Sequence, residues 1–234
     1  EADSATILIH PNSDENQGHV EFYPELNAVV GYNPVHRIYQ GWGEPSGFSG
    51  HFVILFEDTF STYGTWEDDE IIPGRDLADG GGTADVGAWV KLPVNSDGMV
   101  RLMVGTSFTS MDRALKNLDG EIPNWEFDEI RRQAEDAWNS ELGSVAVSGG
   151  SNDEKTMFYT ALYHSMILPR IYSDRDGSYP GFAGDERVHV ADDFTYYGDF
   201  SMWDTFRAIH PLYTLLLPER ARNITAAERT TAAV

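Results

Sequence analysis

Short apolar runs separated by turn residues fill the first 108 positions of the chain. Four of these runs have the length of β-strands: residues 6–9 (TILI), 51–56 (HFVILF), 86–90 (VGAWV) and 99–104 (MVRLMV). The segments between them are rich in glycine, proline, asparagine and aspartate, and none has the periodicity of a crossover helix. Parallel strands need such a crossover, so the pattern predicts an antiparallel β-sandwich.

The hydrophobic period changes at Ser110. Ser110 is a good helix cap, and we expect a short helix from there through Leu118 that Gly120 ends. A second helix is predicted over residues 127–142, with charges on one side and a single apolar face. That face consists of Ile130, Ala134, Ala137, Trp138 and Leu142.

A third helix is predicted over residues 155–168, where Ser151 and Glu154 have the spacing of a capping box. Its body (MFYTALYHSMIL) is apolar on nearly every face. A helix of this kind belongs inside a larger helical assembly. Short strands are predicted in the loop-rich passage that follows, at residues 170–173 and 187–190.

A second capping-box pattern, Ser201 with Asp204, predicts one further apolar helix that runs through Pro211 to Leu217. Pro218 then begins another helical stretch. The second half of the chain is therefore expected to be mainly helical.

Composition narrows the class of protein. Of 234 residues 41% are hydrophobic and 12% aromatic, enough for a packed core. The 38 acidic residues outnumber the 16 basic ones and give a formal charge of -22, which disfavours nucleic-acid and membrane partners. Cysteine is absent, so disulfides, thiolate zinc sites and thiol nucleophiles are excluded for this chain. We expect any export signal to lie outside it, because residues 1–10 have no signal-peptide pattern.

Several acidic and histidine residues could carry chemistry, but each has a simpler interpretation. The pairs Asp68-Asp69 and Asp192-Asp193 are interpreted as solvated loop carboxylates. Residues 12–16 and 174–177 resemble fragments of calcium loops without the full ligand spacing, and are interpreted as turns. For His164 and His210, which lie in apolar helices, a hydrogen-bonded core position is favoured over a catalytic role.

Residues 196–207 (YYGDFSMWDTFR) are the richest passage in functional side chains. Trp203 beside Asp204 suits a sugar pocket, since an indole face packs on the C–H surface of a pyranose while a carboxylate accepts hydrogen bonds from its hydroxyls. In the alternative, Asp204 caps the helix that begins at Ser201 and Trp203 is a core residue. Composition and spacing leave both alternatives open.

Five ordered blocks resemble glycoside hydrolase family 92, whose members are calcium-dependent, inverting exo-α-mannosidases. The blocks are residues 61–66 (STYGTW), 104–108 (VGTSF), 121–127 (EIPNWEF), 158–164 (FYTALYH) and 200–208 (FSMWDTFRA). The resemblance implies a β-sandwich domain over residues 1–108, incomplete at its start, and a helical linker over 109–150. Residues 151–234 would begin an (α/α)6 catalytic domain and be truncated.

The resemblance also implies a site. Trp203 and Asp204 match the family's Trp-Asp that contacts the terminal mannose, and we expect them to bind substrate. The catalytic carboxylates and calcium ligands are expected outside this chain, so no residue here is assigned a catalytic or metal role. The expected partners are mannose-containing glycans and the remaining part of the same catalytic domain.

The resemblance therefore implies a secreted or periplasmic glycoside hydrolase that removes terminal α-linked mannose, this chain being a fragment without the catalytic carboxylates. The alternative is a non-catalytic carbohydrate-binding or structural surface protein, for which the strand-rich half and the aromatic content would suffice.

Overall fold

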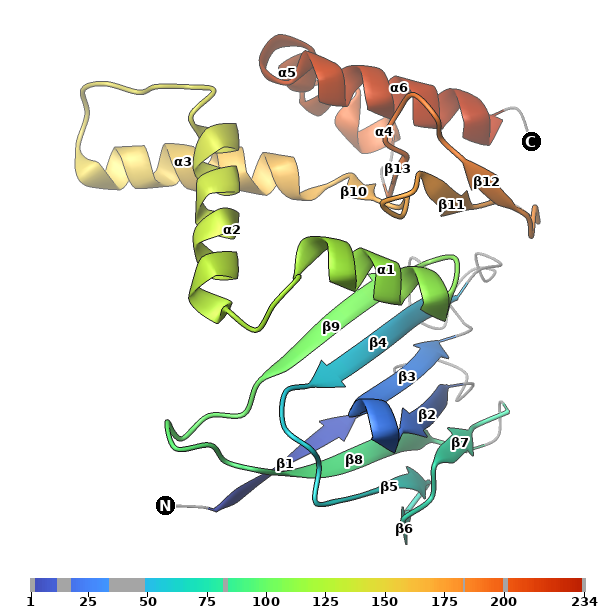
Figure 1. Ribbon diagram of the computed structural model, residues 1–234. Helices are drawn as coiled ribbons and strands as arrows, with labels where there is room; N and C mark the ends of the chain where they lie inside the picture. The colour runs from blue at the N-terminus through green and yellow to red at the C-terminus, as the bar shows by residue number, and fades with distance from the viewer. Residues whose placement is uncertain are drawn as a thin grey trace. The chain divides into compact units, whose positions relative to one another are not determined.

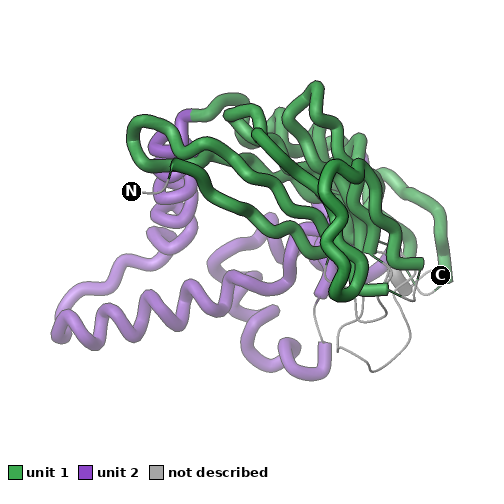
Figure 2. Tube along the Cα trace, turned by 90° about the horizontal axis from the view of Figure 1, so that it is seen from below, with its two compact units in different colours: residues 1–125, 173–190 green, residues 126–172, 191–234 purple. Residues whose placement is uncertain are grey.

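The computed structural model describes residues 3–11, 18–33, 49–81, 84–182, 184–199 and 202–232. The chain divides into two compact units (Figure 2). The first comprises Glu1–Trp125 with Ser173–Val190, and the second Glu126–Tyr172 with Ala191–Val234.

The first unit contains two antiparallel sheets (Figure 1). The four-stranded sheet has the order β1 (Ser4–Ile9), β8 (Val86–Pro93), β5 (Thr62–Glu67), β6 (Glu70–Pro73). The five-stranded sheet has the order β7 (Leu77–Asp79), β2 (His19–Tyr23), β3 (Ala28–Asn33), β4 (Gly50–Phe56), β9 (Leu102–Ser107). A short 3-10 helix, Pro24–Leu26, joins β2 to β3 through Asn27, whose φ is 49°.

The core of this unit lies between the two sheets. Alternate residues of β2, such as Val20 and Phe22, are buried in one cluster with alternate residues of β8, such as Val90 and Leu92. Both sheets thus contribute one inner face, as in a β-sandwich. The fold predicted for this part of the chain is confirmed.

The four predicted strands are present, each with bounds that differ by one to three residues at an end, and one of them is shifted as a whole. The strand expected over residues 99–104 begins at Leu102 instead, because residues 95–99 form a turn. The Asn95 side chain closes this turn by accepting the N–H of Asp97 at 3.0 Å and that of Met99 at 2.9 Å. The β2–β3 pair was missed by the sequence reasoning.

Helix α1 (Met111–Glu121) packs on β9 and β4 of the five-stranded sheet, opposite the four-stranded one (Figure 1). Ser110 caps it as predicted, its Oγ accepting the N–H of Arg113 at 3.2 Å. The sheet and helix approach closely at Gly105, where an added Cβ would lie 2.3 Å from the carbonyl oxygen of Ala114. The helix continues past Gly120, which was expected to end it, by one residue.

The hairpin of β11 (Ser178–Pro180) and β12 (Val188–Val190) belongs to the first unit. The turn before it carries Asp174, whose side chain accepts hydrogen bonds from Thr109 Oγ1 and, at 2.8 Å, from Asn117 Nδ2. Asn117 in turn accepts the N–H of Arg175 at 3.0 Å. The turn at residues 174–177, far along the sequence, is therefore hydrogen-bonded to α1 and to Thr109 just before it.

The second unit is mainly helical (Figure 1). Its helices are α2 (Phe127–Leu142), α3 (Asn152–Ile167), α4 (Met202–Thr205), α5 (Ile209–Leu216) and α6 (Pro218–Ala232). Two short strands, β10 (Arg170–Ile171) and β13 (Tyr197–Gly198), pair antiparallel. The predicted capping box of α3 is present: Ser151 Oγ accepts the Glu154 N–H at 3.3 Å, and Glu154 accepts the Ser151 N–H at 2.7 Å.

Packing in the second unit centres on α5. The hydroxyl of Tyr213, 1% exposed, donates to the carbonyl oxygens of Ser165 and Leu168 at the end of α3, the latter at 2.6 Å. The apolar face predicted for α2 is not buried: its Trp138 is 38% exposed. Much of α3 is exposed too, including Met157 at 64%, so its burial among further helices stays a prediction. No helix of the described residues is long and apolar enough to span a bilayer.

Candidate substrate-contact site

Trp203 and Asp204 are neighbours on α4, a helix of four residues that follows β13. Both side chains are exposed, and Trp203 is 86% exposed. Trp203 is therefore not a core residue of the described structure, which was one of the two alternatives for this passage. Ser201, the expected cap of this helix, lies outside the described residues.

Asp199 lies three positions before α4, and its carboxylate has two hydrogen-bonded partners. Asp199 has a positive φ of 62°, and its side chain accepts hydrogen bonds from the Arg170 guanidinium and, at 2.6 Å, from the Tyr172 hydroxyl. Burial raises the pKa of Tyr172, and so does the hydrogen bond to Asp199, so this hydroxyl stays protonated and donates. The pairing of β10 with β13 brings these side chains together.

The chain leaving α4 is held by an imidazole. Thr205 Oγ1 and His210 Nε2 are hydrogen-bonded at 2.8 Å. The prediction of one helix through Pro211 is wrong, because α4 ends at Thr205 and α5 begins at Ile209. Proline lacks the N–H that a helix interior requires, so the restart places Pro211 in a first turn, where no N–H is needed.

A hydrogen-bonded core position was expected for His164 and His210, and the described residues provide it for His210 alone. His210 is half-buried and hydrogen-bonded, as expected of a core histidine. His164 is exposed on α3, with its ring centroid 5.6 Å from that of Tyr163, so the described residues do not bury it and its core position stays a prediction. Its helix is apolar in sequence, but this face of it is not covered by described residues.

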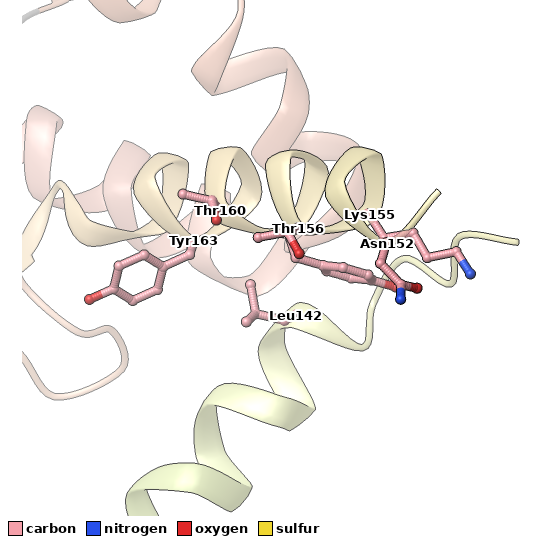
Figure 3. Close-up of a pocket in the computed structure, with 7 residues that line it drawn as sticks. Leu142, Asn152, Lys155, Thr156, Thr160 and Tyr163 are labelled. Atoms are coloured by element: carbon pink, nitrogen blue, oxygen red, sulfur yellow. The ribbon is translucent and has the colours of Figure 1, made fainter. Parts of the chain in front are cut away.

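A shallow hollow of about 540 Å³ lies between the end of α2 and α3 (Figure 3). It is lined by Leu142 of α2 and by Asn152, Lys155, Thr156, Tyr159, Thr160 and Tyr163 of α3. The hydroxyl of Tyr159 donates to the carbonyl oxygen of Val145 at 3.0 Å. No carboxylate lines the hollow, so it offers no acid–base pair.

A calcium ion requires a cluster of oxygen-bearing side chains, with which the described residues can be compared. No group of three or more aspartate, glutamate or histidine side chains comes together in the part of the chain that the structure describes. Asp68, Asp69, Asp192 and Asp193 are exposed in loops, as interpreted from the sequence. Residues 174–177 form the predicted turn, closed by a hydrogen bond from the Gly177 N–H to the Asp174 carbonyl oxygen. Residues 12–16 lie outside the described residues.

Comparison with known proteins identifies the family. The model for the glycosyl hydrolase family 92 catalytic domain matches residues 113–230, just over half of the chain. The chain belongs to glycosyl hydrolase family 92. The recognition made from the five sequence blocks is thereby confirmed, and Trp203 and Asp204 fall inside the matched region.

Solved structures of family 92 enzymes share the fold. The inverting mannosidase BT2199 from Bacteroides thetaiotaomicron matches 95% of this chain at a TM-score of 0.82 and 27% identity. The α-mannosidase BT3965 from the same organism matches 97% at a TM-score of 0.80 and 25% identity. This family 92 chain covers only 29% and 30% of those two chains. The predicted order, a β-sandwich followed by helices, is confirmed.

A sequence relative comes from the fungus Arthroderma benhamiae. It is named an uncharacterized secreted glycosidase and is 40% identical over 94 residues, which cover 37% of this family 92 chain and 12% of the relative.

The sequence reasoning missed three residues beside the predicted pair: Arg170, Tyr172 and Asp199. Asp199 lies in the passage singled out for its aromatic and acidic residues, so a signal for it was present. The donors are 27 and 29 positions away, however, and nothing in a single sequence shows that pairing.

Proposed function

We propose that this chain is part of an exo-acting α-mannosidase that removes terminal α-linked mannose with inversion, and that Trp203 and Asp204 contact that mannose. The observation that carries the proposal is an exposed Trp-Asp pair within the region matched by a catalytic-domain model. The match favours a hydrolase over the carbohydrate-binding or structural alternative. Two structurally similar enzymes are described as a mannosidase and an α-mannosidase.

The chemistry of the pair suits a sugar. The indole of Trp203 offers a flat apolar face to the C–H surface of a pyranose, and an exposed indole needs little rearrangement to do so. The carboxylate of Asp204 accepts hydrogen bonds from two adjacent hydroxyls, which fixes the orientation of the ring. Trp203 and Asp204 are adjacent on α4 and point in different directions around the helix axis, so a sugar that contacts both would lie between the two side chains.

We further propose that the acid, the base and the calcium ligands come from the remaining part of the catalytic domain. An inverting glycosidase needs two carboxyl groups roughly 6.5 to 9.5 Å apart with a water between them. This chain covers less than a third of the matched enzymes, which leaves ample sequence for those groups. The exposed apolar side chains of α3 are surface that further helices of that domain would cover.

We also propose that the enzyme acts on mannose-containing glycans outside the cytoplasm, in the periplasm or after secretion. The support is the name of the relative from Arthroderma benhamiae, a secreted glycosidase.

The test is an assay of the protein at its full encoded length on aryl α-mannosides, with the first-formed anomer followed by NMR. We expect β-mannose as the initial product and loss of activity with a chelator, restored by calcium. Asp204→Ala should lower kcat/KM by about 10- to 150-fold, the loss of a charged hydrogen bond of about 1.5 to 3 kcal/mol. Trp203→Ala should lower it by about tenfold.

Two matched variants serve as controls. Trp138→Ala removes an exposed indole from α2, and Asp192→Ala removes an exposed loop carboxylate. Both should retain kcat/KM. Equal activity of the Trp203 and Asp204 variants with the wild type would remove the pair from the site, and α-mannose as first product would contradict inversion. Absence of hydrolysis of any mannoside, with sugar binding retained, would favour the non-catalytic alternative.

A further inference from the structure

Helix α4 lies between two polar contacts, one at each end. Asp199, three residues before the helix, is bonded to Arg170 and Tyr172, and Thr205 at its last position is bonded to His210. We propose that Asp199, Tyr172 and His210 are positioning residues, which fix the direction in which α4 presents Trp203 and Asp204. The inference rests on the proposed function of that pair.

A four-residue helix does not hold its own orientation. One turn of helix is unstable in isolation, because nucleation orders several residues for a single hydrogen bond. Core packing within the described part of the chain does not orient α4 either, since Met202, Trp203 and Asp204 are all exposed there. Among the described residues, its direction is therefore set by contacts made on either side of it.

The hydrogen bond between Tyr172 and Asp199, before α4, is shielded from water and closely packed. The Asp199 side chain is 19% exposed and Tyr172 is 6% exposed, so the hydroxyl–carboxylate bond is largely shielded from water. Strand β13 lies against the tyrosine ring: a Cβ on Gly198 would be 2.9 Å from it. Asp199 adopts a left-handed backbone conformation, which aspartate tolerates better than most residues.

The contact after α4 leads back to the same place. His210 lies in the first turn of α5, and Tyr213 one turn later donates to the carbonyl oxygen of Leu168. Leu168 is two residues before Arg170, which holds Asp199. The contacts on both sides of α4 thus lead to the same segment, residues 168–172, which follows α3. All of these residues lie within the second unit.

This arrangement makes a kinetic prediction. If the contacts hold α4 in its binding-competent direction, then losing one lowers the fraction of enzyme that is competent, and apparent affinity falls by the same factor. Saturating substrate selects the competent form, so kcat changes less than KM. In the full-length enzyme we expect Asp199→Ala to raise KM for an aryl α-mannoside about tenfold and Tyr172→Phe a few-fold, with kcat within about threefold.

The second contact has a conservative pair of variants. Thr205→Val keeps the shape of the side chain but removes the hydroxyl bonded to His210, and should raise KM in the same way. Thr205→Ser restores the hydroxyl and should restore KM. A residue that only stabilises the fold would not raise KM when the hydroxyl is lost and restore it when the hydroxyl returns. If Asp199→Ala does not fold, Tyr172→Phe and Thr205→Val test the positioning role instead.

A double-mutant cycle with Trp203→Ala separates positioning from stability. If Asp199 acts through α4, the two effects on KM are not additive, and Asp199→Ala has a smaller effect in the Trp203→Ala background, where only Asp204 is left to be positioned. The matched control is Glu141→Gln, which breaks an ion pair of 3.2 Å with Arg220 in the same unit. It should lower the melting temperature and leave KM unchanged.

Three results would overturn the inference: unchanged KM in Asp199→Ala, additive effects in the cycle, or an equal rise of KM in Glu141→Gln. The proposed function fails in a different way. If Trp203→Ala and Asp204→Ala both keep wild-type kcat and KM, the substrate contact is wrong whatever Asp199 does. If they are impaired while Asp199→Ala is not, only the positioning role is wrong.

Discussion

Asp174 fastens the β11–β12 hairpin to the first unit, and its removal should loosen that hairpin. The residue is 7% exposed, and its side chain accepts hydrogen bonds from Thr109 Oγ1 and Asn117 Nδ2. The substitution Asp174→Ala deletes both bonds at once. It leaves the half-buried Thr109 hydroxyl, which is also bonded to Ser107 Oγ at 3.0 Å, and one amide N–H with fewer partners, a loss that water does not fully repair.

The size of the effect follows from these contacts. A hydrogen bond to a charged group contributes about 1.5 to 3 kcal/mol, so two give an upper bound of about 6 kcal/mol. Asn117 Nδ2 also donates to the Thr106 carbonyl oxygen at 2.9 Å, and keeps that partner in the variant. We therefore expect a loss of about 3 kcal/mol in the local stability of the hairpin, or about a hundredfold in its opening equilibrium.

Amide hydrogen exchange over residues 174–190 measures this directly, because it reports local opening without requiring the whole protein to unfold. Protection there should fall about a hundredfold while that of β8 is unchanged. His51 gives a second signal. Burial lowers its pKa and Asp174 partly opposes this, so Asp174→Ala should lower the pKa of His51 further.

The matched control is Asp176→Ala in the same turn. Asp176 pairs with Arg113 at 3.0 Å and accepts the Ser178 N–H at 3.0 Å, but its side chain is 47% exposed, and contacts of exposed carboxylates contribute about 1 kcal/mol or less. Protection of the hairpin should fall at most about fivefold in this variant. Equal protection in the wild type and Asp174→Ala would refute the argument, as would an equal fall in both variants.

Further predictions concern the sheet–helix contact, α5 and pH. Gly105→Ala should destabilise the protein by about 1 to 3 kcal/mol in thermal melting, because its Cβ would meet the carbonyl of Ala114, whereas Gly50→Ala, with open space around it, should not. Tyr213→Phe should destabilise the second unit by about 1 to 3 kcal/mol, because two carbonyl oxygens at the end of α3 lose their donor. Amide exchange protection of α3 and α5 would measure this loss. Burial raises the pKa of Asp176, but hydrogen bonds from Ser178 and from the nearby Arg113 guanidinium outweigh this effect and lower the pKa to about 2. The contribution of Asp176 to stability is therefore complete above its ordinary pKa of about 4 and is lost toward pH 2. Exchange protection of the hairpin should fall over that pH range, and should fall less in Asp176→Asn.

Features set by neighbouring residues were predictable from the sequence. The caps at Ser110 and Ser151 were found because a cap and the N–H it accepts are three residues apart. The same local reasoning could have placed the break before α5, since Pro211 cannot lie in a helix interior. The β2–β3 pair was missed because residues 19–33 mix apolar, aromatic and acidic side chains without a clear alternation.

Features set by distant residues were not predictable. Asp174 contacts side chains 57 and 65 positions earlier, so the sequence showed a turn but not what the turn was attached to. The predicted site shows the same limit. Adjacency in sequence was enough to propose that Trp203 and Asp204 act together, but the contacts on either side of α4 come from Tyr172, just after β10, and from α5.

An exposed apolar side chain can belong to a sugar site or to a surface that further helices of the domain bury. The residue next to it in the sequence distinguishes the two cases. Met157 of α3 is exposed within an apolar helix, and a covering helix would bury it without desolvating a charge. Trp203 is followed at once by a carboxylate, which an apolar helix would leave without hydrogen bonds at a considerable free-energy penalty. A pyranose presents an apolar C–H face and several hydroxyls together, so it can pack on the indole and satisfy Asp204 in the same complex. The Trp-Asp pair therefore fits a carbohydrate ligand better than it fits a further helix of the domain.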